Sequence, residues 1–124
     1  MHVPFWNKEI ETLDRAGICK IQAERLSDIL SWAFKTPFYA KRLAQAGINS
    51  PADLSGLEDI QRIPFTTKDD MRRAFPQGLM AVGMEESVRV HSSSGTTGIA
   101  TVIYLTADDM ENWTDLLARS VTAT

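Results

Sequence analysis

Hydrophobic side chains recur at intervals of three to four residues between Asp14 and Thr36. They are Ile18, Ile21, Leu26, Ile29 and Ala33, and charged residues lie between them. The carboxylate of Asp14 can accept the free N–H groups of a first helical turn, and Thr36 precedes a proline, which disfavours helical geometry. The pattern therefore predicts one long helix between these two residues.

Shorter helices are predicted on either side of this long helix. Two kinds of signal mark their ends: a glycine after a periodic run, and a serine or threonine with an acid three residues later. The predicted segments are residues 5–13, residues 38–46 ending at Gly47, a helix that starts at residues 50–53, and a helix from residues 67–70 to about Phe75.

The pattern changes to a period of two after Glu86. Apolar and polar residues alternate over residues 88–91, and residues 101–105 are rich in the β-branched and aromatic side chains that are typical of strands. A last helix is expected after Thr106. This region therefore predicts two strands that form a hairpin, followed by a helix.

The predicted fold class is α/β, which within this chain takes an α+β form. It consists of a mainly helical leader over residues 1–85, followed by the region of two strands and a helix over residues 86–124. An isolated pair of strands is marginally stable in water, and its open edges invite pairing with further strands. We therefore expect a longer protein, or association with another chain, to complete the sheet.

Composition and charge restrict the classes of function. The chain has 124 residues, 44% of them hydrophobic and 23% charged, which is typical of one folded domain. Its formal charge is −3, which argues against nucleic acid or an anionic membrane as the main partner. A single cysteine excludes an intramolecular disulfide, and no apolar run approaches the roughly 20 residues of a membrane span. A cytoplasmic protein is expected.

The candidate chemistry lies in the loop between the two predicted strands. Residues 92–98 read Ser-Ser-Ser-Gly-Thr-Thr-Gly. Gly95 and Gly98 allow the backbone to approach an anion closely and to adopt positive φ values, so that successive N–H groups can converge on phosphate oxygens. The hydroxyls around them can donate to phosphate or ligate Mg²⁺.

The better-known glycine loops do not match this segment. A Walker A loop needs lysine directly after its last glycine, and Ile99 stands there; the G-x-G-x-x-G pattern of dinucleotide-binding folds is also absent. A strand follows the loop, so no helix N-terminus adds its dipole. The residues by themselves leave two interpretations open, a phosphate-binding loop and a polar hairpin connection.

Residues 91–98 and several shorter segments resemble one family of enzymes. The loop is similar to the Ser/Thr-Ser-Gly-Ser/Thr-Thr-Gly loop of adenylate-forming enzymes, and His91 extends it to the His-x-Ser-Ser-Gly-Thr-Thr-Gly segment of phenylacetate–coenzyme A ligases. Further segments that resemble this branch are Phe5-Trp6-Asn7, Pro37-Phe38-Tyr39, Ile63-Pro64-Phe65-Thr66-Thr67-Lys68, Thr101-Val102 and Trp113. Two positions depart from the superfamily pattern: Ala100 replaces a frequent proline, and Thr101 replaces a frequent lysine.

The resemblance implies an ATP-dependent, AMP-forming acid–CoA ligase. A carboxylic acid, such as an aryl acid, attacks the α-phosphate of ATP, and the thiol of coenzyme A then displaces AMP; Mg²⁺ neutralises phosphate charge. The residues implied to hold the β- and γ-phosphates are Ser93, Ser94, Gly95, Thr96, Thr97 and Gly98. The resemblance places residues 86–124 at the start of the adenylation domain and assigns no catalytic residue and no protein ligand of a metal within the chain.

The same resemblance implies that most of the active site lies outside these 124 residues. The chain is therefore expected to be inactive alone, and it does not specify which acid is used. A second hypothesis belongs to a different class: a non-catalytic interaction module, whose helical leader mediates dimerisation and whose strands pair with another chain. The two hypotheses are compatible.

Two alternatives stay open for the remaining candidates: His91 could contact phosphate or orient the loop, and Lys68, Arg72 and Arg73 could contact adenylate or CoA. Ordinary structural roles are favoured. They are a strand position for His91, a helix cap for Asp108 and Asp109, a solvated helix face for Lys68, Arg72 and Arg73, a buried apolar position for Cys19, and a place in the core or at a domain interface for Phe5, Trp6, Trp32 and Phe34.

Overall fold

The fold is that of a computed structural model, which describes residues 5–95 and 98–122. The elements are the helices α1 (Lys8–Glu11), α2 (Arg15–Ala33), α3 (Pro37–Gln45), α4 (Lys68–Ala74) and α5 (Ala107–Thr122), the strands β1 (Arg89–Ser92) and β2 (Val102–Leu105), and the 3₁₀ turns η1 (Pro51–Asp53), η2 (Leu57–Arg62) and η3 (Met84–Glu86).

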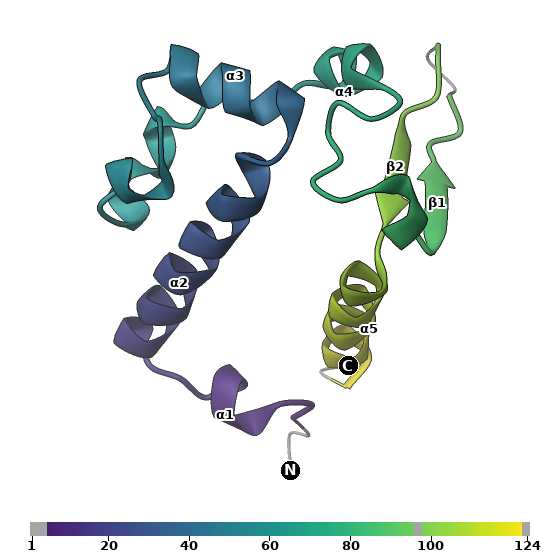
Figure 1. The fold of residues 1–124 in the computed structure, drawn as a ribbon. Helices are drawn as coiled ribbons and strands as arrows, with labels where there is room; N and C mark the ends of the chain where they lie inside the picture. Colours follow the sequence, from purple (N-terminus) through teal and green to yellow (C-terminus); the bar gives the residue numbers. More distant parts are fainter. Residues whose placement is uncertain (1–4, 96–97, 123–124) are drawn as a thin grey trace.

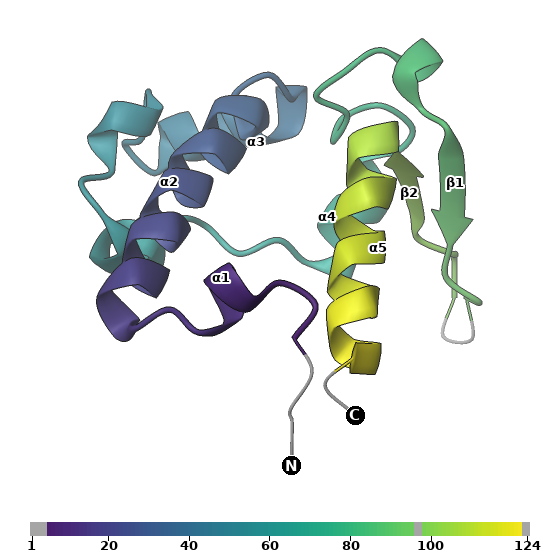
Figure 2. The same ribbon diagram turned by 90° about the horizontal axis from the view of Figure 1, so that it is seen from below.

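The elements form two groups that are joined at both ends (Figures 1 and 2). One group holds α2, α3 and the turns η1 and η2; the other holds α4, the hairpin and α5. The segment between η2 and α4 connects the two groups at one end, and α1 approaches α5 at the other. There Trp6 Nε1 donates a hydrogen bond to Asp115 Oδ1 at 2.6 Å, and the Arg119 guanidinium lies 3.6 Å from the Glu11 carboxylate.

The predicted long helix is confirmed by α2 and its caps. The Asp14 carboxylate accepts a hydrogen bond from the Gly17 N–H at 2.8 Å, which satisfies a free donor of the first turn. Thr36 then caps α3, accepting from the Tyr39 N–H at 3.1 Å. Because α3 begins at Pro37, these two helices meet at the predicted boundary.

A small hydrophobic core lies between α2, α3 and the segment that follows. Leu30, Leu43 and Ile48 are buried, and they are flanked by partly buried residues. Gly47 has φ +75°, which lets the chain leave α3 and return Ile48 to the core; the Ile48 N–H donates to the Leu43 carbonyl at 2.9 Å. The predicted glycine stop is confirmed.

Two predicted helices are shorter than expected. The first spans only Lys8–Glu11, because Asn7 caps it and the capping residue Asp14 already starts the next helix. The start signal at Ser50 leads to the single 3₁₀ turn η1 rather than to a helix. The chain becomes extended at Leu54, and this residue packs against the core. The packing of Leu54 therefore ends the turn that begins at Ser50.

The predicted hairpin is confirmed. Strands β1 and β2 are antiparallel, with Arg89 opposite Leu105 and Ser92 opposite Val102. They form a two-stranded sheet among the described residues, and α5 follows β2 directly. Together with the helices, this is the α/β fold class that the pattern predicts. The boundary between residues 85 and 86 stays a prediction.

The prediction that the aromatic residues lie in the core or at a domain interface is corrected in part. Trp6 and Trp32 keep about half of their surface exposed, at 54% and 48%, whereas Phe34 packs against the core. An interface role for Trp32 stays a prediction. Within the described ranges, no helix combines the length and the apolar character that crossing a membrane requires.

Candidate functional site

The candidate site is the loop that joins β1 to β2 at the outer end of the hairpin (Figure 2). Ser93, Ser94, Gly95 and Gly98 belong to the described part of the chain. Thr96 and Thr97, which were also predicted to hold phosphate, lie outside it. Ser94 and Gly98 are exposed and Gly95 is half-buried, so a ligand can reach this loop from solvent.

Two hydrogen bonds between Ser93 and Thr101 close the base of the loop. The Ser93 N–H donates to the Thr101 carbonyl at 2.9 Å, and the Thr101 N–H donates to Ser93 Oγ at 2.9 Å. The hydroxyl of Ser93 thus serves as an acceptor within the loop, and its own proton is still able to donate to a ligand. Thr101 is buried, so this pair sets where the loop leaves the sheet.

Two glycines make the turn inside the loop. Gly95 has φ +66° and Gly98 has φ +135°, as the sequence predicts, and the Gly98 N–H donates to the Gly95 carbonyl at 2.9 Å. A Cβ at position 95 would lie 2.8 Å from the Gly98 carbonyl oxygen. An L side chain at Gly95 is therefore opposed both by backbone conformation and by lack of space.

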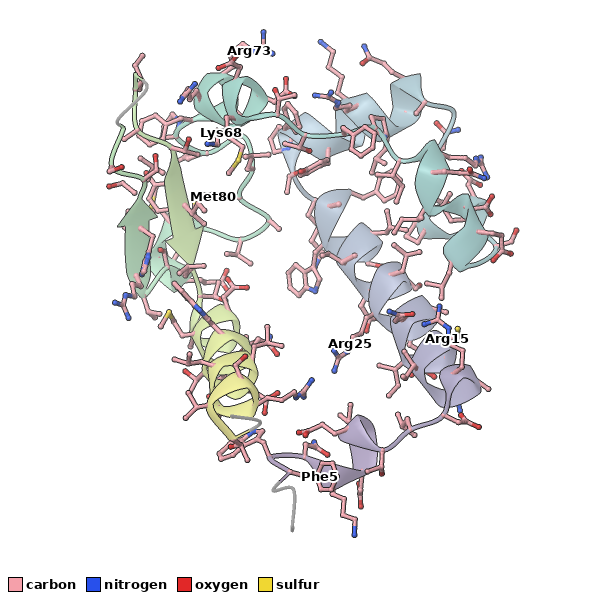
Figure 3. The ribbon with its side chains drawn as sticks, turned by 180° about the vertical axis from the view of Figure 1, so that it is seen from behind. Phe5, Arg15, Arg25, Lys68, Arg73 and Met80 are labelled. Carbon is pink, nitrogen blue, oxygen red and sulfur yellow. The ribbon has the colours of Figure 1, made fainter. Side chains whose placement is uncertain are left out.

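Helix α4 contacts the exit of the loop through Arg72. Its Nε–H donates to the Ile99 carbonyl at 2.8 Å, and its Nη1 lies 2.8 Å from Asp69 Oδ1. Only 25% of the Arg72 side chain is exposed. The prediction that Arg72 belongs to a solvated helix face is therefore wrong, whereas the Arg73 side chain is 74% exposed and extends outward (Figure 3).

Asp70 fixes α4 in place. Its carboxylate accepts from the Thr67 N–H at 2.9 Å and contacts Arg73 at 2.7 Å and Arg42 of α3 at 2.9 Å. The hydrogen bonds from Thr67, followed by those from Arg73 and Arg42, hold the pKa of Asp70 well below its usual range. The carboxylate therefore stays charged and joins α3 to the helix that contacts the loop.

Two aromatic contacts brace the hairpin. The His91 ring lies 5.0 Å from the Trp113 ring of α5, with the planes tilted by 59°. Phe75, directly after α4, stacks on Tyr104 of β2 at 6.5 Å. The contact with Trp113 agrees with the structural role that was predicted for His91, and both contacts fix the strands that carry the loop.

Asp109 is a helix cap, as predicted. Its Oδ2 accepts from the Thr106 N–H and hydroxyl, both at 2.9 Å, and its own N–H donates to Thr106 Oγ1 at 3.2 Å. No group of three or more potential protein ligands for a metal occurs among the described residues. Cys19 is half-buried rather than fully buried.

An open cavity of about 900 Å³ separates the two groups of elements. Its walls come from α2, the segment after α4, β2 and α5; Arg25 extends into the space from α2, and Met80 lies on the opposite wall (Figure 3). Ile29 and Trp32 line it from α2, and 63% and 48% of their surface is exposed. The cavity is thus a second surface, distinct from the loop.

The relatives of the chain are phenylacetate–coenzyme A ligases. It is 44% identical over 120 residues to the enzyme of Thermus thermophilus and 38% identical over 121 residues to that of Escherichia coli. These alignments cover 96% and 94% of this chain. The resemblance to phenylacetate–coenzyme A ligases is confirmed. The chain spans only 27% and 28% of the length of these two relatives.

Solved structures agree with the sequence relatives. The crystal structure of a 2-hydroxyisobutyryl-CoA ligase, in complex with 2-HIB-AMP and CoA in the thioesterification state, matches with a TM-score of 0.84 at 30% identity. The match covers 95% of this chain and 26% of that ligase. The same ligase in its postadenylation state also gives a TM-score of 0.84. No protein-family model matches the chain.

Sequence reasoning missed two residues that build the loop. The sequence places Thr101 at the start of a strand and gives it no role in the loop, although its backbone closes the loop with Ser93. Arg72 contacts a residue 27 positions away, and no local pattern signals such a contact. The phosphate role of the loop residues themselves stays a prediction.

Proposed function

We propose that these residues carry the phosphate-binding loop of an ATP-dependent, AMP-forming acid–CoA ligase of the phenylacetate–CoA ligase type. The observation that carries the proposal is the loop geometry: Gly95 and Gly98 at positive φ in an exposed turn, closed at its base by Ser93 and Thr101. The relatives and the similar ligase structures support the same reaction class.

The loop would act by positioning and by charge stabilisation. Backbone N–H groups and the hydroxyls of Ser93, Ser94, Thr96 and Thr97 would hold the β- and γ-phosphates, with Gly95 and Gly98 allowing close approach. This would aim the α-phosphate at the carboxylate and stabilise the departing pyrophosphate. Mg²⁺ would arrive with ATP and neutralise phosphate charge, and exposed hydroxyl oxygens suit such a hard cation.

The complete reaction would form two bonds in sequence. Attack by the acid carboxylate on the α-phosphate gives an acyl adenylate and pyrophosphate, and attack by the coenzyme A thiol then gives the thioester and AMP. Because the chain spans about a quarter of its relatives, we propose that it contributes the phosphate contacts and the preceding helical leader, and that it is inactive alone. Residues 86–124 would begin the adenylation domain.

Titration of the complete protein with MgATP tests the loop directly. Gly95→Ala should weaken MgATP binding by about 10-fold or more, since both the φ value and the close carbonyl oppose a Cβ. Gly47→Ala is the matched control, because Gly47 also has a positive φ but lies in the other group of elements, at the end of α3. Equal MgATP affinity in both variants and the wild type would refute the phosphate role.

Hydroxyl removal gives a second test of the same site. The double variant Thr96→Ala and Thr97→Ala should lower both MgATP affinity and the rate of thioester formation, measured by isothermal titration and by consumption of coenzyme A thiol. Unchanged values for both quantities would show that these hydroxyls do not contact phosphate.

The exposed apolar surface favours a second candidate function, an interaction module. Ile29 and Trp32 face the open cavity, and Val90 and Ile103 of the hairpin are exposed at 57% and 45%. Such surface is typical of segments that pack against further protein or against a second copy. Size-exclusion chromatography with light scattering decides whether a dimer forms, and a monomer over a wide concentration range would contradict this candidate.

A further inference from the structure

We propose that Arg72 is a positioning residue of the phosphate loop, acting as a tether between α4 and the loop exit. This inference rests on the proposed function of the loop. Its central observation is the 2.8 Å hydrogen bond from Arg72 Nε to the Ile99 carbonyl, which joins two segments 27 residues apart. Neither residue belongs to the set that the sequence predicts to contact nucleotide.

The exit of the loop has little apolar packing to hold it. The Ile99 residue is 78% exposed, so its side chain contributes little to fixing the backbone. The polar contact of its carbonyl is therefore the stronger restraint. Arg72 suits this task because a guanidinium has several N–H donors in a rigid fork, which allows it to bind the carbonyl and a carboxylate at once.

Arg72 is itself held by contacts within α4, and α4 is held by a contact with α3. Asp69 contacts its Nη1 at 2.8 Å, one turn earlier in α4, and three quarters of the side chain is buried. The helix is in turn joined to α3 by the Asp70–Arg42 ion pair at 2.9 Å. A continuous set of contacts thus runs from α3 through α4 to Ile99.

The consequence for nucleotide binding is preorganisation. A loop that binds phosphate through backbone N–H groups must hold those groups in one arrangement, and ordering it at the moment of binding lowers affinity. The Gly98–Gly95 turn bond and the Thr101–Ser93 bond lie just before and just after Ile99 in the chain. Fixing the Ile99 carbonyl therefore stabilises both bonds before the nucleotide arrives.

An alternative is that Arg72 stabilises only α4, through its ion pair with Asp69. The two roles differ in what they predict for the loop. A tether affects exchange of the Gly98 and Thr101 amide protons, whereas a helix-stabilising ion pair affects amides of α4. Arg73 offers the matched control, since it is the next residue, carries the same charge, is 74% exposed and contacts Asp70 rather than the loop.

Amide hydrogen exchange on the complete protein without nucleotide is the first measurement. Arg72→Gln should accelerate exchange at Gly98 and Thr101 by about 10-fold, the effect of losing one hydrogen bond from a charged donor. Arg73→Gln should leave both amides within about 2-fold of the wild type. Unchanged exchange at both amides in Arg72→Gln, with α4 still folded, would overturn the tether.

A second pair of variants keeps the test decisive if Arg72→Gln does not fold. Arg72→Lys retains the charge beside Asp69 but lacks the rigid guanidinium fork whose Nε and Nη1 reach Ile99 and Asp69 at once. Asp69→Asn removes the ion pair and retains the donor to Ile99. Faster loop exchange in Arg72→Lys alone supports the tether, whereas equal acceleration in Asp69→Asn overturns it.

Steady-state kinetics separate this inference from the proposed function. Arg72→Gln should raise KM for ATP by about 10-fold and leave KM for the acid and for coenzyme A within about 2-fold. An equal rise in all three constants would overturn the positioning role. A wild-type protein that fails to bind MgATP refutes the proposed function, while the exchange data still decide whether Arg72 tethers the loop.

Discussion

The two groups of elements differ in how they are held together. The group around α2 and α3 has a small apolar core, with Leu30, Leu43 and Ile48 buried at 4%, 1% and 0% exposure. In the group around α4 and the hairpin, the buried residues among those described are polar, Asp70 and Thr101. The first group is stabilised by local apolar packing; the second depends on hydrogen bonds, ion pairs and aromatic contacts.

This contrast explains where the candidate site lies. A ligand loop needs exposed donors on a defined backbone, and polar contacts can define a backbone without covering it. Ser93, Arg72 and Asp70 do so in the second group. The same group leaves apolar side chains exposed, among them Val90 and Ile103.

Removing the centre of the apolar core should have the largest effect. Leu43→Ala is expected to lower the free energy of unfolding by about 3 kcal/mol, because it deletes a fully buried side chain and leaves a cavity. Urea denaturation followed by circular dichroism measures the change. An effect below about 1 kcal/mol would contradict the assignment of the core.

Acidification should weaken the fold, with a large contribution from Asp70 in the group around α4 and the hairpin. The contacts from Thr67, Arg73 and Arg42 lower the pKa of Asp70, so they stabilise the fold above the ordinary pKa of a free aspartate, about 4, and this stabilisation is lost as the pH falls below it. The urea midpoint should therefore decrease between about pH 5 and pH 3. Asp53 and Asp59 also have lowered pKa values and contribute a background in the same direction.

The variant Asp70→Asn isolates this effect, since its amide cannot lose a charge. It should be less stable than the wild type at pH 7, and its urea midpoint should change less between pH 5 and pH 3. A pH dependence as steep as that of the wild type would assign the effect to other carboxylates.

Truncating an apolar residue of the hairpin should have a much smaller effect than truncating the core. Ile103→Ala is expected to lower the free energy of unfolding of the 124-residue chain by about 1 kcal/mol or less, because Ile103 is 45% exposed. In the complete protein, the effect should rise if further residues cover the hairpin. An equally small effect in the 124-residue chain and in the complete protein would indicate that this surface stays exposed to solvent.

The contact between the chain ends should have the smallest effect. Trp6→Phe removes the indole donor to Asp115 and keeps most of the apolar surface. Because the contact is exposed, we expect a loss of about 0.5 kcal/mol in the free energy of unfolding. A loss several times larger would mean that α1 and α5 form part of the stable core.

Elements whose signals are local can be predicted from the sequence. Asp14, Thr67 and Thr106 each bond a backbone N–H three residues later, so a short stretch of chain is enough to predict these caps. The strand alternation and the glycines of the loop are equally local. The resemblance to phenylacetate–coenzyme A ligases was also present in short motifs that recur along the chain.

Contacts between residues far apart in the sequence are visible only in the folded chain. The Arg72–Ile99 bond joins residues 27 positions apart, and the Trp6–Asp115 bond joins residues 109 positions apart. The single turn at Ser50 likewise ends where Leu54 reaches the core. Such contacts depend on how the elements pack, and no hydrophobic or capping pattern within one segment carries that information. The loop was therefore predictable as a segment, whereas its support by α4 was not.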